Sequence, residues 1–144
     1  MIQEKLIYSI NELPDVANKI KELMKEYKIF AFVGSLGAGK TTLIREILKN
    51  VGVKETISSP TFAYVNSYTI KEGKIYHFDL YRLKSLDDFI GAGFAEILHQ
   101  PDSWSFIEWP EIIMPILTEN SCIIFIDYQG LDNRILHYKC IPKS

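Results

Sequence analysis

The sequence lacks several features that mark specialised classes of protein. No apolar run approaches the ~20 residues of a membrane-spanning helix, and no basic segment followed by an apolar stretch predicts a signal peptide. Acidic and basic residues nearly balance, at 18 Asp+Glu against 16 Lys+Arg, which argues against an autonomous nucleic-acid binder. Cys122 and Cys140 have no metal-ligand spacing, so we expect both to be reduced, inert strand residues of a cytoplasmic chain.

The composition that remains is that of an ordinary globular domain. Of the 144 residues, 47% are hydrophobic and 24% are charged, which excludes an intrinsically disordered chain. A domain of ~150 residues buries roughly 68–70% of its unfolded surface, enough for a substantial core. Because no repeat, linker or low-complexity segment interrupts the sequence, we expect one domain spanning residues 1–144.

The spacing of apolar residues predicts an α/β fold. Apolar positions three and four apart predict an amphipathic helix over 11–27. The continuous apolar run 29–33 indicates a strand covered on both faces, as in a parallel sheet. From 62 to 81 the period becomes two, which predicts a β-hairpin that turns at Gly73. Further strands are predicted at 6–10, 106–108, 122–126 and 135–140, and further helices at 40–50 and after Ser85.

A glycine-rich segment carries the strongest functional signal. Residues 34–41 read GSLGAGKT, which fills G-x-x-x-x-G-K-[ST] without a mismatch and lies between a predicted buried strand and a helix. In such a loop, backbone N–H groups form an anion nest at a helix N-terminus. Lys40 is placed to reach the β- and γ-phosphates, Thr41 to bind Mg²⁺ and Thr42 to reach the α-phosphate. The predicted nucleotide-binding residues are Gly34, Leu36, Gly37, Ala38, Gly39, Lys40, Thr41 and Thr42.

The same motif predicts the architecture and requires a second acidic residue. We expect a P-loop NTPase-like three-layer sandwich with a mostly parallel central sheet and an inserted β-hairpin. An acid at the end of a neighbouring strand completes the Mg²⁺ site, and Asp79, Glu108 and Asp127 all qualify. Asp127 begins a D-x-x-G segment like that of GTPases, but no [N/T]-K-x-D guanine motif occurs. The residue pattern alone leaves the three candidates open.

Four motifs follow one another along the chain: GSLGAGKTT at 34–42, SPTF at 59–62, HFDLYR at 77–82 and IEWPE at 107–111. The glycine-rich loop alone is common to many families, but the four motifs together are specific. With them the chain resembles the TsaE (YjeE) family over nearly its whole length. That resemblance implies a P-loop ATPase of bacterial tRNA threonylcarbamoyladenosine (t6A) biosynthesis.

The resemblance also assigns catalytic roles. It implies that Lys40 is the phosphate lysine, that Thr41 and Glu108 hold Mg²⁺, and that Asp79 is the second essential carboxylate. It thereby selects Glu108 over Asp127. The implied catalytic residues are therefore Lys40, Asp79 and Glu108.

Further residues near the nucleotide follow from the same resemblance. Thr61 takes the position of a switch-like threonine near the γ-phosphate, and Trp109 lies beside the site. Arg134 is the candidate for a C-terminal arginine that contacts the nucleotide. His77 has two open interpretations, either orienting Asp79 or serving as an ordinary strand histidine.

Three functions are compatible with these residues. The resemblance implies a Mg²⁺-dependent ATPase, slow alone, that drives a complex with the TsaD and TsaB subunits, with tRNA held only through these partners and no membrane involved. The alternative is a small-molecule kinase, which closes an arginine-bearing lid over its phosphates. Only three arginines occur, and no lid segment is evident. A GTPase-like switch or a non-hydrolysing nucleotide-binding module is the third possibility, which the missing guanine motif and the candidate carboxylates disfavour.

Overall fold

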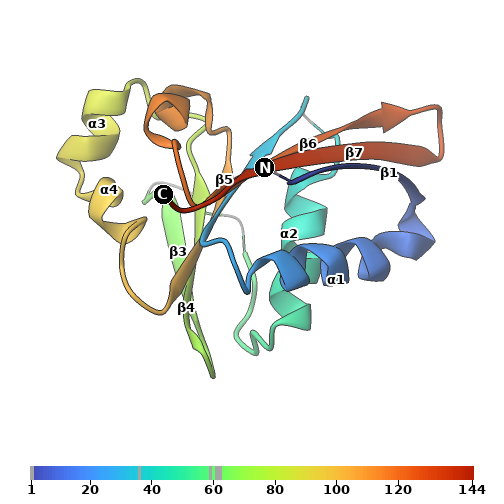
Figure 1. Ribbon diagram of the computed structural model, residues 1–144, viewed down its shortest axis with the longest axis horizontal. Helices are drawn as coiled ribbons and strands as arrows, with labels where there is room; N and C mark the ends of the chain where they lie inside the picture. The colour runs from blue at the N-terminus through green and yellow to red at the C-terminus, as the bar shows by residue number, and fades with distance from the viewer. Residues whose placement is uncertain (1, 36, 59, 61–62) are drawn as a thin grey trace.

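The computed structural model describes residues 2–35, 37–58, 60 and 63–144 (Figure 1). Within these ranges one seven-stranded sheet has the order β1-β7-β6-β2-β5-β4-β3. The strands are β1 (Ile2–Ser9), β2 (Ile29–Val33), β3 (Val65–Ile70), β4 (Gly73–Asp79), β5 (Ser103–Glu108), β6 (Ser121–Gln129) and β7 (Asn133–Ile141). The helices are α1 (Leu13–Leu23), α2 (Lys40–Asn50), α3 (Leu86–Gly91) and α4 (Phe94–Ile97), with 3₁₀ turns η1 (Ile10–Glu12) and η2 (Glu111–Ile116).

The sheet is mixed, with a parallel centre and antiparallel edges. Strands β4, β5, β2 and β6 run parallel to one another, whereas β3, β7 and β1 run antiparallel to their neighbours. The expectation of a mostly parallel sheet therefore holds only for the four central strands. The difference arises at β6–β7, because a connection of only residues 130–132 joins antiparallel strands, and parallel strands need a long crossover. The inserted hairpin is confirmed as β3–β4.

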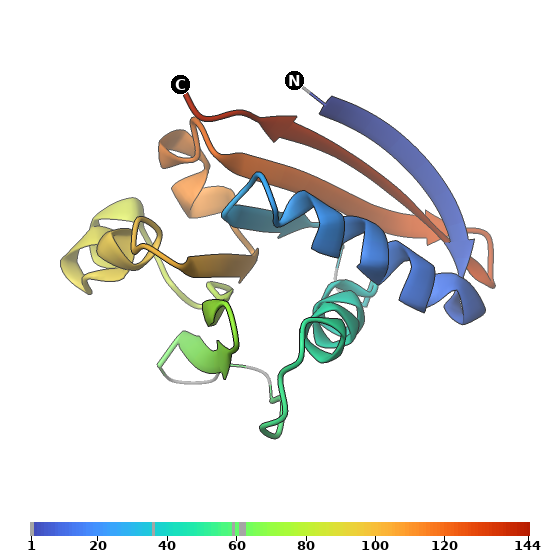
Figure 2. The same cartoon turned by 60° about the horizontal axis from the view of Figure 1, so that its bottom comes forward.

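Helices cover both faces of the central strands (Figures 1 and 2). On one face, α1 and α2 pack over a core in which the rings of Phe30 and Phe106 stack with centroids 5.2 Å apart. On the other face, α3, α4 and η2 bury a second cluster around Phe78 and Phe89. This two-sided cover explains the continuous apolar run of β2, since a strand with both faces buried has no solvent-facing position.

The helices follow the predicted periodicity with small changes at their ends. The predicted helix 40–50 is α2, with the same bounds, and Pro14 occupies the tolerated first turn of α1. The predicted helix 11–27 begins with η1 and ends earlier, because a turn replaces α-helix after Leu23. Among the described residues, no helix is long and apolar enough to cross a membrane.

The two cysteines correct a sequence-based expectation. Cys122 on β6 and Cys140 on β7 are directly opposite each other in the antiparallel register and form a disulfide. Both are fully buried. The expectation of unpaired cysteines is therefore wrong, because sequence separation does not reveal which residues the strand register places side by side.

Candidate functional site

The glycine-rich loop lies at the carboxyl edge of the parallel strands, where ligands bind in open α/β sheets. It leaves β2 after Val33 and opens α2 at Lys40. Gly34 has no room for a side chain, because a Cβ there would lie 2.3 Å from the carbonyl oxygen of Ile126. Gly39 precedes α2 at φ 107°, which glycine adopts without strain. The chain thus turns from strand to helix within the predicted phosphate loop.

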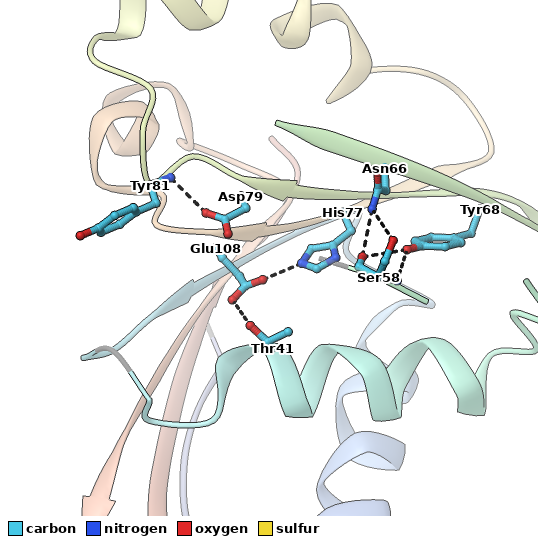
Figure 3. Close-up of polar contacts among 8 residues, drawn as sticks. All are labelled: Thr41, Ser58, Asn66, Tyr68, His77, Asp79, Tyr81 and Glu108. Atoms are coloured by element: carbon cyan, nitrogen blue, oxygen red, sulfur yellow. Dashed lines mark hydrogen bonds and ion pairs between the residues drawn. The ribbon is translucent and has the colours of Figure 1, made fainter. Parts of the chain in front are cut away.

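A buried carboxylate faces the first turn of α2 (Figure 3). Glu108 ends β5 and is 3% exposed. The Thr41 hydroxyl donates a hydrogen bond to Oε1 at 2.6 Å, and Nε2 of the fully buried His77 lies 2.7 Å from Oε2. Burial raises the pKa of Glu108, but the hydrogen bond from His77, its charge and the Thr41 hydroxyl together hold that pKa below its ordinary value. Glu108 is therefore an ionised group with both oxygens engaged.

Asp79 lies beside Glu108, as the sequence-based roles require. The two residues are paired in the parallel register of β4 and β5. Burial raises the pKa of Asp79 and the neighbouring charge of Glu108 raises it further, against the lowering effect of the Tyr81 N–H, which donates to Oδ1 at 3.1 Å. His77 lies on β4 and its Nε2 bonds Glu108, so the interpretation in which it orients Asp79 is not observed, whereas that of a strand histidine with a hydrogen-bond partner is (Figure 3).

Lys40 is held under an aromatic ring. Its Nζ donates to the carbonyl oxygen of Gly34 at 2.7 Å and lies 3.5 Å from the centroid of the Trp109 ring. Burial lowers the pKa of Lys40, while the charge of Glu108 acts in the opposite direction. Trp109 follows β5 directly and adopts φ 56°. The exposed Tyr81 packs on its ring, with ring centroids 5.0 Å apart. The expected position of Trp109 beside the loop is observed.

The opposite flank of the loop is formed by β6 and β7. The Tyr128 hydroxyl donates to the Gly37 carbonyl at 2.8 Å, and Arg134 Nε donates to the Ala38 carbonyl at 3.2 Å. Asp127 accepts a hydrogen bond from Ser35 Oγ at 3.3 Å. Arg134 therefore contacts the loop itself. Sequence reasoning missed Tyr128, and no pattern marks it except its position within the D-x-x-G segment.

A cavity of about 340 Å³ lies next to the loop, between the start of α1 and the β6–β7 turn. Glu108 is not among the residues that line it. Thr42, which was predicted to reach the α-phosphate, contributes to its wall. The lining residues are Tyr8, Ile10, Leu13, Gly37, Gly39, Thr42, Leu131, Asp132 and Arg134.

Two predicted residues, Leu36 and Thr61, lie outside the described residues, so their roles stay predictions. Within the second segment, 59–62, the structure describes only Pro60. Directly before it, the Ser58 carbonyl oxygen accepts hydrogen bonds from Asn66 and Tyr68 on β3 (Figure 3). These contacts attach the residue that precedes the SPTF segment to the β3–β4 hairpin, which carries His77 and Asp79.

The oxygen atoms at the start of α2 suit Mg²⁺. Thr41 Oγ1 and Glu108 Oε1 are adjacent hard donors at 2.6 Å, and Mg²⁺ characteristically takes one or two protein oxygens while phosphates and waters complete its octahedron. Within the described ranges, no cluster of three or more His, Cys, Asp or Glu side chains could hold a metal alone. The residues present therefore fit a cation that arrives together with phosphate groups.

Fold and loop together define the class of protein: an α/β protein with a mixed seven-stranded sheet and a P-loop sequence between β2 and α2. The chain belongs to the family described as "Threonylcarbamoyl adenosine biosynthesis protein TsaE", which matches residues 7–136. Membership makes it a component of tRNA threonylcarbamoyladenosine biosynthesis and confirms the resemblance drawn from the four motifs.

Individual relatives agree with this assignment. The tRNA threonylcarbamoyladenosine biosynthesis protein TsaE of Rickettsia conorii is 39% identical over 126 residues, which cover 87% of this chain and 70% of the relative. The protein of the same name from Aquifex aeolicus is 32% identical over 136 residues, covering 92% and 90%. The crystal structure of Bacillus subtilis YdiB has the same fold, with a TM-score of 0.69 at 24% identity, covering 97% of this chain and 86% of that one.

Proposed function

We propose that residues 1–144 form a single domain that binds Mg·ATP and hydrolyses it for the t6A-modifying complex. Its intrinsic turnover is slow and its partners, the TsaD and TsaB subunits, stimulate it in the cytoplasm, where tRNA is held by those partners. The observation that carries this proposal is the contact of the Thr41 hydroxyl with the buried, ionised Glu108 at 2.6 Å, next to Lys40 in the same loop.

The loop supplies the phosphate site in this proposal. Lys40 exchanges its hydrogen bond to the Gly34 carbonyl for the β- and γ-phosphate oxygens, which offer negative charge in place of a neutral acceptor. Its low exposure, 5%, strengthens the attraction because little water screens it. The cavity of about 340 Å³ at the other end of the loop receives the base. Adenine is the base we propose, because the sequence has no guanine-reading motif.

Thr41 and Glu108 hold the magnesium ion. When bound, Mg²⁺ neutralises charge that develops on the β- and γ-phosphate oxygens during in-line attack by water. His77 keeps the Glu108 carboxylate in place through its contact at 2.7 Å. Because the hydrogen bonds to Thr41 and His77 already engage both Glu108 oxygens, we assign the attacking water to Asp79. Its raised pKa is the property expected of a group that accepts a proton during the reaction.

The kinase alternative is less well supported by the same observations. Of the three arginines, Arg45 lies within α2, Arg134 donates to the Ala38 carbonyl, and Arg82 is exposed in the turn after β4. Two of the three therefore have fixed places in the domain, whereas a phosphoryl-transferring kinase needs arginines on a segment that closes over the loop and excludes water from its acceptor. We therefore retain water as the acceptor.

The test is ATP turnover by the purified chain with Mg²⁺, alone and with TsaD and TsaB. We expect slow hydrolysis alone, a stimulation by the partners, and a loss of both with Lys40→Ala or with EDTA. Lys28→Ala is the matched control, because Lys28 stacks on Trp104, away from the loop. Turnover that the partners leave unchanged contradicts the partner-driven cycle, and turnover that survives Lys40→Ala contradicts the phosphate site.

A further inference from the structure

The β6–β7 hairpin packs closely against the glycine-rich loop. A Cβ at Gly34 would meet the Ile126 carbonyl oxygen at 2.3 Å, and one at Gly37 would meet the Tyr128 hydroxyl at 2.9 Å. The backbone of the hairpin therefore leaves no room for a side chain at Gly34, whereas at Gly37 the φ of 80° is what favours glycine, with the Tyr128 hydroxyl close by. The G-x-x-x-x-G-K-T pattern of this chain serves contact with its own fold as well as contact with phosphate.

The hairpin contacts are directed at the backbone of the loop. Tyr128 donates to the Gly37 carbonyl and Arg134 donates to the Ala38 carbonyl. In a planar trans peptide the C=O and the following N–H point in opposite directions. An Ala38 carbonyl held toward Arg134 therefore sends the Gly39 N–H to the other side of the loop. A Gly37 carbonyl held toward Tyr128 likewise directs the Ala38 N–H inward, where it closes a turn on Ser35 O at 3.1 Å.

The two side chains also support each other. The guanidinium of Arg134 lies 4.4 Å above the Tyr128 ring, and its Nη1 donates to the Asn133 carbonyl. Tyr128 is 48% exposed, so burial in the core does not fix it. Its place is determined by the stacked arginine and by its hydrogen bond to the loop.

We propose that Tyr128 and Arg134 are positioning residues that keep the loop carbonyls turned outward, so that the Gly39 N–H is presented to phosphate before the nucleotide arrives. This inference rests on the proposed function and deepens it, because it assigns part of the nucleotide affinity to a hairpin outside the P-loop motif. It also assigns a role to the D-x-x-G segment, because Asp127 accepts a hydrogen bond from Ser35 of the same loop.

A preorganised loop alters binding and leaves the chemical step unchanged. Tyr128 and Arg134 contact loop carbonyls, whereas Thr41 and Glu108 contact each other on the opposite flank. Without the contacts of Tyr128 and Arg134, part of the binding free energy is spent on reorganising the loop. Once the nucleotide is bound, the groups around Glu108 have their ordinary geometry.

The experiment compares Tyr128→Phe with Tyr76→Phe. Each change removes a single hydroxyl, and that of Tyr76 bonds Gln100 instead of the loop. The readouts are the Kd of a fluorescent ADP analogue together with KM and kcat for Mg·ATP. We expect Tyr128→Phe to raise Kd and KM by roughly 3–10-fold, the range for one lost hydrogen bond, with kcat within about twofold. Tyr76→Phe should leave all three unchanged.

Arg134→Lys provides the second arm. Lysine keeps the charge but loses the planar fork that bonds the loop and stacks on the ring. Its effect on Kd should be non-additive with that of Tyr128→Phe, since the two residues act as one unit. A Tyr128→Phe protein that binds ADP as the wild type does, or that loses kcat at unchanged KM, overturns this inference alone. A wild type that binds no adenine nucleotide overturns the proposed function as well.

Discussion

The two flanks of the glycine-rich loop differ in chemistry. On the β4–β5 side, the ionised Glu108 is buried and bonded to Thr41 and His77 at 2.6 and 2.7 Å. On the β6–β7 side, the more exposed Tyr128 and Arg134 donate to neutral backbone carbonyls at 2.8 and 3.2 Å. One flank concentrates charge where phosphate and metal would be, and the other fixes the path of the backbone. Substitutions on the β4–β5 side should therefore lower turnover, and those on the β6–β7 side should lower the affinity for nucleotide.

The largest expected effect is on the charged flank. Glu108→Gln keeps the shape of the side chain but removes the charge that Mg²⁺ needs, so we expect turnover to fall by roughly 1,000-fold. Mg²⁺ should also no longer tighten ADP binding, which calorimetry with and without the metal measures. Asp127→Asn is the matched control: Asp127 bonds Ser35 on the other flank, so its turnover at saturating Mg·ATP should stay within about twofold of wild type, whatever it does to the affinity. An active Glu108→Gln beside an inactive Asp127→Asn would reverse the choice of carboxylate.

A smaller loss is expected for the second carboxylate. Asp79→Asn should reduce turnover by roughly 100-fold while ADP binding is retained. Because its pKa is raised in the folded protein, Asp79 contributes stability below its ordinary pKa that is lost as pH rises through the folded value. The variant should therefore be more stable than wild type near pH 7, and the difference should close toward pH 4. Thermal unfolding across that range checks the sign, and a destabilised variant at pH 7 would contradict it.

His77 belongs to the charged flank and acts through Glu108. His77→Leu removes the donor to Oε2, and we expect a fall in kcat of roughly tenfold, in the range seen for groups that orient a metal ligand. His77→Gln supplies an amide N–H donor in place of the imidazole and should recover part of that loss. If the role of His77 is purely structural, both variants should lose the same stability and His77→Gln should not recover kcat. Turnover measured over a range of Mg²⁺ concentrations checks this, because it gives both kcat and the Mg²⁺ concentration for half-maximal turnover.

The smallest effect is expected far from the loop, at Tyr138. Its hydroxyl donates to Glu4, and burial together with that contact raises the pKa of Tyr138 to about 12. The stability this group provides is present below the ordinary value of 10.0 and is lost as pH rises through about 12. Tyr138→Phe should cost about 1 kcal/mol of unfolding free energy at pH 8, less at pH 11.5, and nothing in KM or kcat. A change in either kinetic constant would show that the β1–β7 edge is coupled to the site.

Local patterns made the loop and its helix predictable. The G-x-x-x-x-G-K-T motif and the apolar spacing that follows depend on residues close in sequence, and α2 has the bounds expected of it. Glu108 and Asp127 could not be ranked from the residue pattern, because both end apolar strands, and both strands neighbour β2. Register separates them: Glu108 pairs with Phe32, level with the end of β2, whereas β6 continues past Val33 before it reaches Asp127.

The features that the sequence did not predict all depend on the register of one strand pair, β6 and β7. The Cys122–Cys140 disulfide and the approach of Tyr128 and Arg134 to the loop all depend on how β7 pairs with β6. That register is set by the β6–β7 turn and by long-range packing against α1, neither of which appears in the spacing of residues along the chain. The family resemblance supplied the roles of individual residues, but it did not supply these contacts.

The most direct test of the division between the flanks is single-turnover hydrolysis of Mg·ATP by wild type, Glu108→Gln and Tyr128→Phe over a range of protein concentrations. Each series yields a maximal rate and a half-saturating concentration. We expect Glu108→Gln to lower the maximal rate by roughly 1,000-fold, and Tyr128→Phe to raise the half-saturating concentration by roughly 3–10-fold at an unchanged maximal rate. A Tyr128→Phe protein with a lowered maximal rate, or a Glu108→Gln protein that reaches the wild-type rate at saturation, would contradict the account.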